Sequence, residues 1–238
     1  TTDPNDLLPD LVPLPARDLK IQKTEDGRTL LLFSTTYFNQ GRGPVELRIT
    51  ENVDRFGDAT RTVFQRIYDI NNAYRDTTVG KFLWHQEHKH YHFDEFAEYD
   101  LQIVDAPDHQ DLSGTRIKNS FCLRDVSKVF LDIPDHAGEA EYTICGEKKQ
   151  GVAVGWGDTY YFDYPAQNLN ITDIESGIYR FVTNVNPKKT LGEIRYDNNS
   201  SATIFKLNKE KGTVTILEEI PQANPIVEHI HLEDPFGM

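Results

Sequence analysis

The segment with the clearest capacity for chemistry is residues 84–92 (WHQEHKHYH), which holds four of the chain's eight histidines. Three of them, His88, His90 and His92, alternate with other residues. Successive side chains of a strand point to opposite faces, so these three share one face if the segment is extended, whereas a helix would scatter them. Imidazole is a common ligand for zinc, copper, iron and nickel. The spacing therefore predicts a metal site without specifying the ion.

Two other interpretations of the histidine cluster stay open from the residues alone. The strand could simply expose its histidines to solvent, or the imidazoles could bind a structural zinc ion. A structural zinc takes a fourth protein ligand, whereas a catalytic site keeps one position open. The spacing does not distinguish between these alternatives.

The surrounding sequence resembles the copper-binding segment of the lysyl oxidases, which are copper-dependent amine oxidases. The histidines are followed by Asp-Glu-Phe at residues 94–96 and by Tyr-Asp-Leu at residues 99–101. Four further stretches match that family in the same order: residues 9–12 (PDLV), 118–125 (KNSFCLRD), 158–160 (DTY), and 171–174 (ITDI) through 198–199 (NN). Together these five blocks span residues 8–206, so the resemblance is more specific than the histidine motif by itself.

The resemblance implies a cofactor that the protein makes from its own side chains. Amine oxidation needs a carbonyl electrophile, which no standard side chain supplies. In lysyl oxidases a lysine adds to an oxidised tyrosine near the copper and gives lysyl tyrosylquinone. Lys118 and Tyr160 match those two positions, and His88, His90 and His92 match the copper ligands. We expect partial burial to lower the pKa of Lys118 and so favour the neutral, attacking amine.

Two carboxylates are candidates for proton transfer. Asp158 matches an aspartate suggested as the catalytic base of the family, and it shares a face with Tyr160 if that segment is extended. An aspartate that only orients a neighbour is the alternative. Glu98 stands where animal members carry a histidine, so it is either a substitute general base or a solvated strand carboxylate.

The resemblance also implies a calcium site, because the matching side chains offer the oxygen ligands that calcium prefers. The positions are Asp10, Leu11 through its carbonyl, Glu193, Asn198 and Asn199. However, Arg195 stands where one acidic ligand is expected. Either Asp197 replaces that ligand, or the guanidinium fills the site in place of an ion.

The predicted function is a copper-dependent amine oxidase that converts primary amines, including peptidyl lysine, to aldehydes with release of ammonia and hydrogen peroxide. The expected cofactors are copper and lysyl tyrosylquinone. Calcium is a further candidate that Arg195 opposes, and zinc could occupy the copper site in a precursor. The partners would be a primary amine or a lysine-containing protein, and molecular oxygen. Two other functions compete: a three-histidine metalloenzyme of another type, such as an iron oxygenase, and a non-catalytic, metal-stabilised β-sandwich binding module.

Composition excludes some classes of function. The net charge of −13 argues against nucleic acid as a partner, because phosphate binding relies on clustered Lys and Arg. No apolar run approaches the roughly 18 residues of a membrane helix, so we expect a soluble protein without a membrane span. The family resemblance implies secretion, although the first residues, TTDP, do not form a signal peptide.

The two cysteines, Cys122 and Cys145, allow one disulfide or two thiols. Both match cysteine positions of lysyl oxidases, where they have other partners, so a bond between them would be a rewiring. Glu87 stands where the histidine motif of the animal proteins has a cysteine.

Short strand-like segments separated by turn residues run through the chain, and none shows a helical apolar stripe. This pattern predicts a mainly β fold, an antiparallel β-sandwich with long loops and little helix. A short helical turn is expected near residues 125–128. The strand candidates are residues 19–23, 29–38, 45–50, 62–70, 81–92, 96–104, 116–122, 141–144, 152–156, 177–185, 202–207 and 213–217.

A chain of 238 residues can form a single domain. We expect an extended N-terminal arm at residues 1–16, which hold four prolines, and a lysyl oxidase-like catalytic domain at residues 17–207. Residues 208–238 would form a C-terminal strand and tail packing on the same domain. His229 and His231 in this tail belong to an ordinary strand, or alternatively to a second metal-binding pair.

Overall fold

The structure, a computed structural model, describes residues 3–49, 60–86, 89–107, 111–112, 115–130 and 132–229. His88 and His231 lie outside the described residues. Within them the chain forms strands and turns but no helix, and hence no helix that could span a membrane. The prediction of a mainly β fold is confirmed, but the short helical turn near residues 125–128 is wrong, because a strand begins at Ser127.

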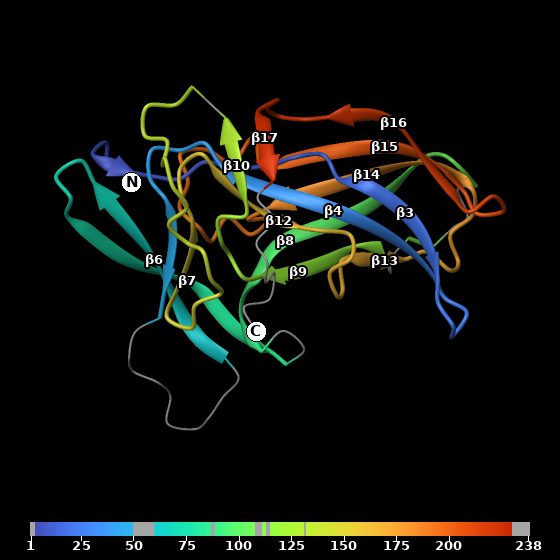
Figure 1. The fold of residues 1–238 in the computed structure, drawn as a ribbon, viewed down its shortest axis with the longest axis horizontal. Coiled ribbons are helices and arrows are strands. Elements are labelled where there is room, and N and C mark those ends of the chain that lie inside the picture. Colours follow the sequence, from blue (N-terminus) through green and yellow to red (C-terminus); the bar gives the residue numbers. More distant parts are fainter. Residues whose placement is uncertain are drawn as a thin grey trace.

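Two antiparallel sheets overlap in the view of Figure 1. The 10-stranded sheet has the order β11-β5-β6-β7-β8-β14-β15-β16, with β1 on β6 and β9 on β8. The 7-stranded sheet has the order β13-β4-β12-β10-β17, with β2 and β3 on β4. The strands are β1 (Asp6–Leu7), β2 (Leu11–Pro13), β3 (Arg17–Lys23), β4 (Thr29–Asn39), β5 (Val45–Arg48), β6 (Thr60–Asp69), β7 (Tyr74–His85), β8 (His90–Asp105), β9 (Ile117–Phe121), β10 (Ser127–Phe130), β11 (Lys149–Val152), β12 (Trp156–Tyr160), β13 (Asn168–Asn170), β14 (Gly177–Val185), β15 (Ser200–Asn208), β16 (Thr213–Ile220) and β17 (Ile226–His229).

Strand β4 is the centre of the smaller sheet, and almost all of its residues are buried. Its aromatic side chains reach the larger sheet. The Phe33 ring lies 4.9 Å from Tyr99 of β8 and 4.7 Å from Phe181 of β14. The Tyr37 ring lies 5.4 Å from Phe96 of β8. These contacts between the inner faces make the two sheets a sandwich.

The histidine motif crosses a hairpin, so the prediction of one strand over residues 81–92 is wrong. Strand β7 ends at His85 and β8 begins at His90, and these two residues are partners in the register. Between them Lys89 adopts a φ of 55° and donates its backbone N–H to the His85 carbonyl at 2.8 Å. A turn without glycine, proline or asparagine gives little signal in the sequence.

Two other predicted strands differ from the structure. Residues 141–144 form bends and irregular chain. The predicted strand at residues 152–156 is interrupted, because Gly155 adopts a φ of 79° between β11 and β12. A side chain on Gly155 would also collide with the His136 ring. Glycine satisfies both constraints, and the turn redirects the chain into β12.

Both end segments pack on the sandwich. β1 pairs with β6 and β2 with β4, and Leu11 and Val12 are fully buried. β16 pairs with β15, and β17 pairs with β10 with His229 opposite Ser127. In Figure 1, β6 and β7 lie at one end of the long axis and the β3–β4 turn at the other.

The core contact between the sheets makes a testable prediction. We expect Phe33→Ala to lower the free energy of unfolding by about 3–5 kcal/mol, because it leaves a cavity where Phe33 met Tyr99 and Phe181. Leu217, which is 52% exposed, is the control, and Leu217→Ala should change it by less than about 0.5 kcal/mol. Urea denaturation measures both. Equal effects of the two substitutions would contradict the inter-sheet core.

Candidate metal centre and its surroundings

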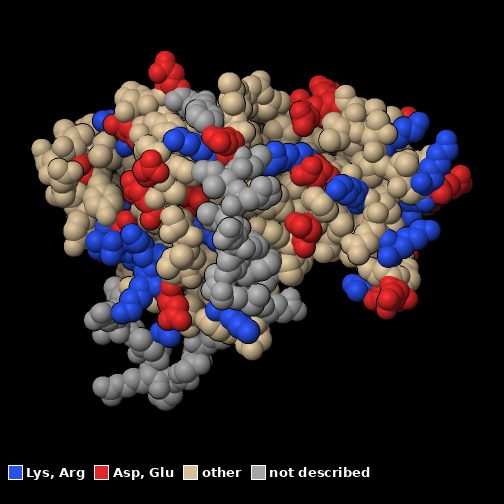
Figure 2. Space-filling model, in the orientation of Figure 1, with Lys and Arg blue, Asp and Glu red and all other residues tan. Residues whose placement is uncertain are grey.

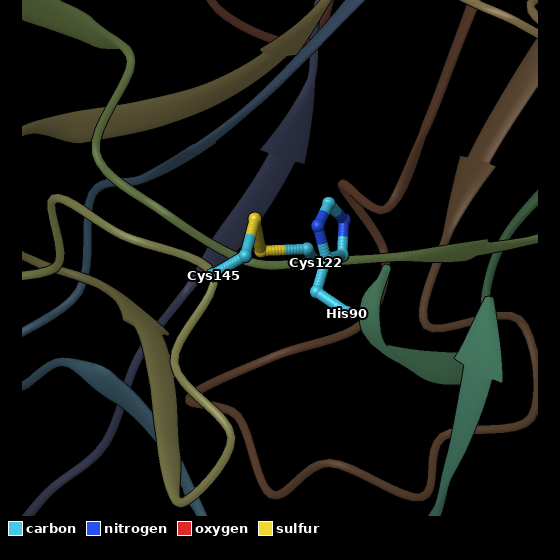
Figure 3. Close-up of side chains that lie close together, drawn as sticks. All are labelled: His90, Cys122 and Cys145. Atoms are coloured by element: carbon cyan, nitrogen blue, oxygen red, sulfur yellow. A yellow bond between two sulfur atoms is a disulfide. The ribbon is translucent and has the colours of Figure 1, made fainter. Parts of the chain in front are cut away.

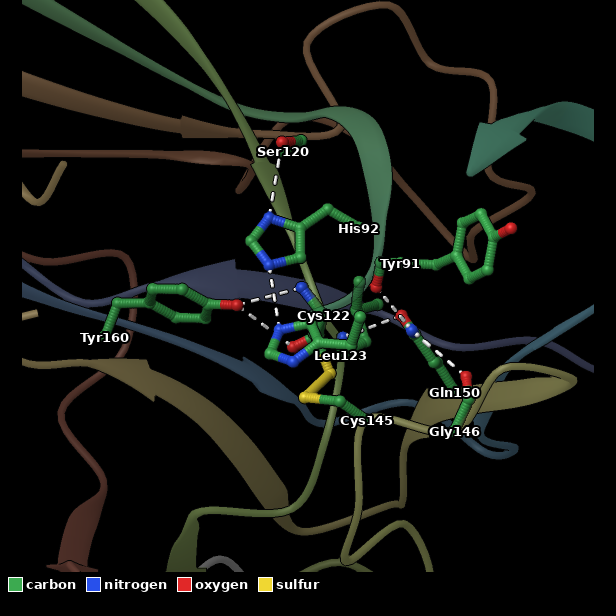
Figure 4. Close-up of a disulfide and its surroundings, with 10 residues drawn as sticks. Tyr91, His92, Ser120, Cys122, Leu123, Cys145, Gly146, Gln150 and Tyr160 are labelled. Atoms are coloured by element: carbon green, nitrogen blue, oxygen red, sulfur yellow. Dashed lines mark hydrogen bonds between the residues drawn. A yellow bond between two sulfur atoms is a disulfide. The ribbon is translucent and has the colours of Figure 1, made fainter. Parts of the chain in front are cut away.

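The β7–β8 hairpin brings two of the predicted metal ligands together. The Nε2 atoms of His90 and His92 lie 3.0 Å apart, and both side chains are buried. Two imidazole nitrogens at this separation can share one proton or bind one ion. The other ring nitrogen of His92 lies 3.4 Å from the Ser120 hydroxyl, a contact that orients the ring (Figure 4).

A further histidine, His85, belongs to this group and was missed by sequence reasoning. Its ring stacks on His92, with centroids 4.7 Å apart and planes inclined by 18°. A hairpin interpretation of residues 84–92 would have found it, because His85 is the register partner of His90. His88, the remaining predicted ligand, lies outside the described residues.

Cys122 and Cys145 form a disulfide beside His90 (Figure 3). The two sulfurs and a His90 ring nitrogen all lie within 4.8 Å of one another. Metal binding by cysteine requires a thiolate, and the disulfide leaves neither sulfur in that form. The bond instead fixes the chain at the end of β9 to the loop before β11, next to the histidines.

Tyr160 is held by the backbone of Cys122. Its hydroxyl accepts a hydrogen bond from the Cys122 N–H at 2.8 Å and donates to the Cys122 carbonyl at 3.3 Å (Figure 4). The Tyr160 ring meets the Phe121 ring edge-on at 4.1 Å. Burial, and then the nearby Asp158 carboxylate, raise the pKa of Tyr160 well above its usual value. The phenol is therefore neutral in this arrangement.

Asp158 lies two residues before Tyr160 in β12, which is extended as the sequence suggested. Its side chain is fully buried, and no hydrogen bond with good geometry reaches either carboxylate oxygen from the described residues. Burial raises the pKa of Asp158 well above its usual value, whereas the charge of Arg124 and the Thr159 N–H oppose that shift in part. Asp158 is thus a buried acid close to Tyr160 and to a buried guanidinium.

Lys118 makes a contact that the sequence did not suggest. Its ammonium donates a hydrogen bond to Glu95 at 2.9 Å, and its side chain is 49% exposed. Glu95 raises the pKa of Lys118, so the expectation of a lowered pKa is wrong. Among the described residues, no hydrogen bond joins Lys118 to Tyr160.

Glu98 is neither solvated nor unpaired. Its side chain is buried, and it accepts a hydrogen bond from the Arg116 guanidinium at 2.8 Å. It also lines a cleft of about 230 Å³ together with Asn184, Tyr196 and Asp197. The ion pair with Arg116 occupies the carboxylate that could have served as a substitute base.

The four side chains predicted to bind calcium do come together. Asp10, Glu193, Asn198 and Asn199 are all buried, although the chain separates Asp10 from the others by more than 180 residues. Asn198 donates to Asp10 at 2.8 Å, and Asn199 donates to Glu193 at 2.8 Å. The Leu11 N–H donates to the second oxygen of Glu193 at 2.7 Å. The predicted group is a compact polar cluster.

The carboxylates of this cluster are already engaged by hydrogen bonds, whereas the amide oxygens of Asn198 and Asn199 have no hydrogen-bond partner among the described residues. Calcium needs oxygen atoms directed at one point, but every carboxylate oxygen of Asp10 and Glu193 already accepts an N–H. The Arg195 guanidinium lies 3.4 Å from Asp10 and supplies a positive charge. Burial raises the pKa of Glu193 to about 7, which weakens it further as an anionic ligand. Of the two alternatives for Arg195, these contacts favour the guanidinium in place of an ion.

Comparison with known proteins gives a consistent picture. The family model described as lysyl oxidase matches residues 50–216, more than half of the chain. The chain is 35% identical over 141 residues to lysyl oxidase homolog 4 of Mus musculus, 38% over 117 residues to protein-lysine 6-oxidase of Gallus gallus, and 37% over 117 residues to lysyl oxidase homolog 1 of Homo sapiens. These matches cover 56%, 49% and 49% of this chain but 17%, 26% and 19% of the relatives. The chain thus matches about a quarter or less of each relative's length.

The polar cluster makes a testable prediction about calcium. Adding calcium to metal-free protein should leave the melting temperature unchanged, because Arg195 already balances the charge of Asp10. Arg195→Asp should be destabilised without calcium, since it sets a second carboxylate near Asp10, and calcium should restore about 4 °C or more. Thermal unfolding monitored by circular dichroism measures both.

The matched control is Arg195→Gln, which removes the same charge but adds no anionic ligand. Its melting temperature should be lowered and should stay unresponsive to calcium. Stabilisation of the unaltered protein by calcium would contradict the replacement of the ion by Arg195.

Proposed function

Because the chain belongs to the lysyl oxidase family, we propose that it is a copper-dependent amine oxidase. It converts primary amines, including lysine side chains of proteins, to aldehydes and releases ammonia and hydrogen peroxide. The observation that carries this proposal is the close approach of the His90 and His92 ring nitrogens. His90 lies beside the disulfide between Cys122 and Cys145, and the Cys122 backbone forms hydrogen bonds with the Tyr160 hydroxyl.

His88, His90 and His92 would hold the copper ion. The fit is supported by the 3.0 Å separation of the His90 and His92 nitrogens, by their burial, and by the contact between Ser120 and His92. Bound copper would exchange electrons with oxygen, and a quinone made from Lys118 and Tyr160 would condense with the amine and accept two electrons from it.

The residues around Tyr160 have separate tasks in this proposal. The Cys122 backbone fixes the position of the Tyr160 oxygen through two hydrogen bonds. Asp158 accepts the proton from the carbon next to the substrate nitrogen, as a general base. To do so it must ionise in a buried position, and the positive charge of Arg124 favours its anion. The Phe121 ring packs edge-on against the Tyr160 ring and restricts its movement on this side.

We also propose that the protein works outside the cell or in another oxidising compartment. The support is the disulfide between Cys122 and Cys145, because such bonds persist mainly where thiols are not kept reduced. The partners of the protein would be a primary amine or a lysine-containing protein, and molecular oxygen.

The test of the proposed function is an assay of amine-dependent peroxide release after loading with copper in air. We expect the wild-type protein to release hydrogen peroxide with a primary amine. Tyr160→Phe and Lys118→Arg should lose at least 100-fold in rate, which corresponds to about 3 kcal/mol. Tyr160→Phe keeps the ring packing but loses the oxygen, and Lys118→Arg keeps the charge but cannot supply the amine.

Other outcomes would favour the competing functions. Oxygen uptake that does not depend on an amine would indicate an oxygenase. Tight zinc binding with no turnover, unaffected by Tyr160→Phe, would indicate a metal-stabilised binding module. Either result contradicts the amine oxidase.

A further inference from the structure

The contact between Lys118 and Glu95 arises from an irregularity in strand β8. Between Phe93 and Ala97 the register advances by four residues on β8 but by only two on β9, where the partners are Phe121 and Asn119. Glu95 lies in the middle of this bulge and adopts a φ of 52°. Bulges redirect side chains, and a positive φ is uncommon for a residue other than glycine. The backbone thus takes an unusual shape where it presents Glu95.

Lys118 does not pair with the carboxylate that regular geometry would give it. Its register partner on β8 is Glu98, but Glu98 accepts its hydrogen bond from Arg116, which lies just before β9. The bulge brings Glu95 to Lys118 instead. The bulge therefore determines which carboxylate Lys118 contacts. That carboxylate is Glu95, although Glu98 lies directly opposite Lys118 in the register.

Glu95 binds two lysines at once. One of its oxygens accepts from Lys118 at 2.9 Å, and the other pairs with Lys188, which lies in the turn after β14. The pKa of Glu95 is lowered by Lys188 first and then by Lys118. The other charged groups that act on Lys118 are Glu98 and Arg116, which form an ion pair and shift the pKa of Lys118 in opposite directions.

We propose that Glu95 is a positioning residue that retains Lys118 as an ammonium ion before the cofactor is made, and that Lys188 competes for the same carboxylate. This inference rests on the proposed function, because it concerns how Lys118 becomes linked to Tyr160. It makes the release of Lys118 from Glu95 a controlling step of cofactor formation.

The chemistry of linkage explains why the contact matters. An ammonium has no lone pair, so Lys118 must first lose one proton to solvent. The Tyr160 ring is separately oxidised to an ortho-quinone by one molecule of oxygen, which places one oxygen atom on the ring and leaves the other as water. The Lys118 nitrogen then forms a C–N bond to a carbon of this quinone ring, in place of the hydrogen there. The two hydrogens displaced, one from nitrogen and one from the ring, reduce molecular oxygen to hydrogen peroxide. Oxygen is already a substrate of the proposed function.

The separation between Lys118 and Tyr160 is a second reason why Lys118 must be released from Glu95. Cys122, which holds the Tyr160 hydroxyl, lies four residues beyond Lys118, or roughly 13 Å along an extended chain. While the Lys118 ammonium is bound to Glu95, it is directed to a different partner from Tyr160. Linkage therefore requires both loss of a proton and movement of the side chain.

The experiment follows the rate of linkage rather than amine turnover. Metal-free protein is loaded with copper in air at pH values from 6.5 to 9.5, and the peptide containing linked Lys118 and Tyr160 is quantified by mass spectrometry against time. For Glu95→Gln we expect several-fold faster linkage near pH 7, because the neutral fraction of an amine rises about tenfold for each unit by which its pKa falls. The ratio of the two rates should stay constant across this range, because every pH in it lies below the ordinary pKa of a lysine, about 10.4.

Two lysine variants give the matched comparison. Lys188→Gln leaves Glu95 to Lys118 alone, so its linkage should be slower than wild type near neutral pH. Lys189→Gln removes the neighbouring charge, which lies over the Tyr196 ring, and should leave the rate unchanged. Opposite effects of Glu95→Gln and Lys188→Gln would not arise from a merely structural role.

Three results would overturn the proposal. Glu95→Gln could link at the wild-type rate at every pH, which would mean that Glu95 does not restrain Lys118. It could link more slowly, which would make Glu95 the base that activates Lys118. Absence of a linked peptide in all four proteins, despite bound copper, would contradict the proposed function itself and this inference with it.

Discussion

The hydrogen bonds between the Tyr160 hydroxyl and the Cys122 backbone join the two sheets at the candidate metal centre. Tyr160 ends β12 of the smaller sheet, and Cys122 follows β9 of the larger one. The disulfide to Cys145 fixes Cys122, and the same sulfurs lie beside His90. The position of the tyrosine is thereby coupled to the position of the histidines. Loss of this contact would separate the metal ligands from the residue proposed to become the cofactor.

Local patterns in the sequence were enough to locate the centre but not to give its shape. The alternation of His90 and His92 correctly placed them on one face of a strand. The sequence gives little signal for the turn between His85 and His90, because the residues between them include no glycine, proline or asparagine. With the turn missed, His85 was assigned to the same strand, and its contact with His92 across the hairpin was not foreseen. The mainly β fold was predictable because the short strands lie between strong turn signals.

Local sequence patterns could not predict contacts between residues that lie far apart in the chain. The family resemblance grouped Asp10 with Glu193. Only the fold shows that the carboxylate oxygens of these two residues already accept hydrogen bonds from amide N–H groups, and that the Arg195 guanidinium lies beside Asp10. Lys118 was expected to be partly buried, with a lowered pKa. The bulge in β8 gives it Glu95 as a partner and reverses the direction of the shift. Neither the bulge nor the ion pair of Glu98 with Arg116 follows from residue types and spacing.

The proposed amine oxidase activity depends most directly on whether Lys118 and Tyr160 become covalently joined when copper is bound. The decisive measurement is peptide mapping by mass spectrometry of protein loaded with copper in air, with zinc-loaded protein as the control, since zinc has no redox chemistry. We predict one cross-linked species that contains both residues in the copper-loaded sample and two separate, unmodified peptides in the zinc-loaded sample. Separate, unmodified peptides in protein that has bound copper, even after incubation at alkaline pH, would contradict the amine oxidase.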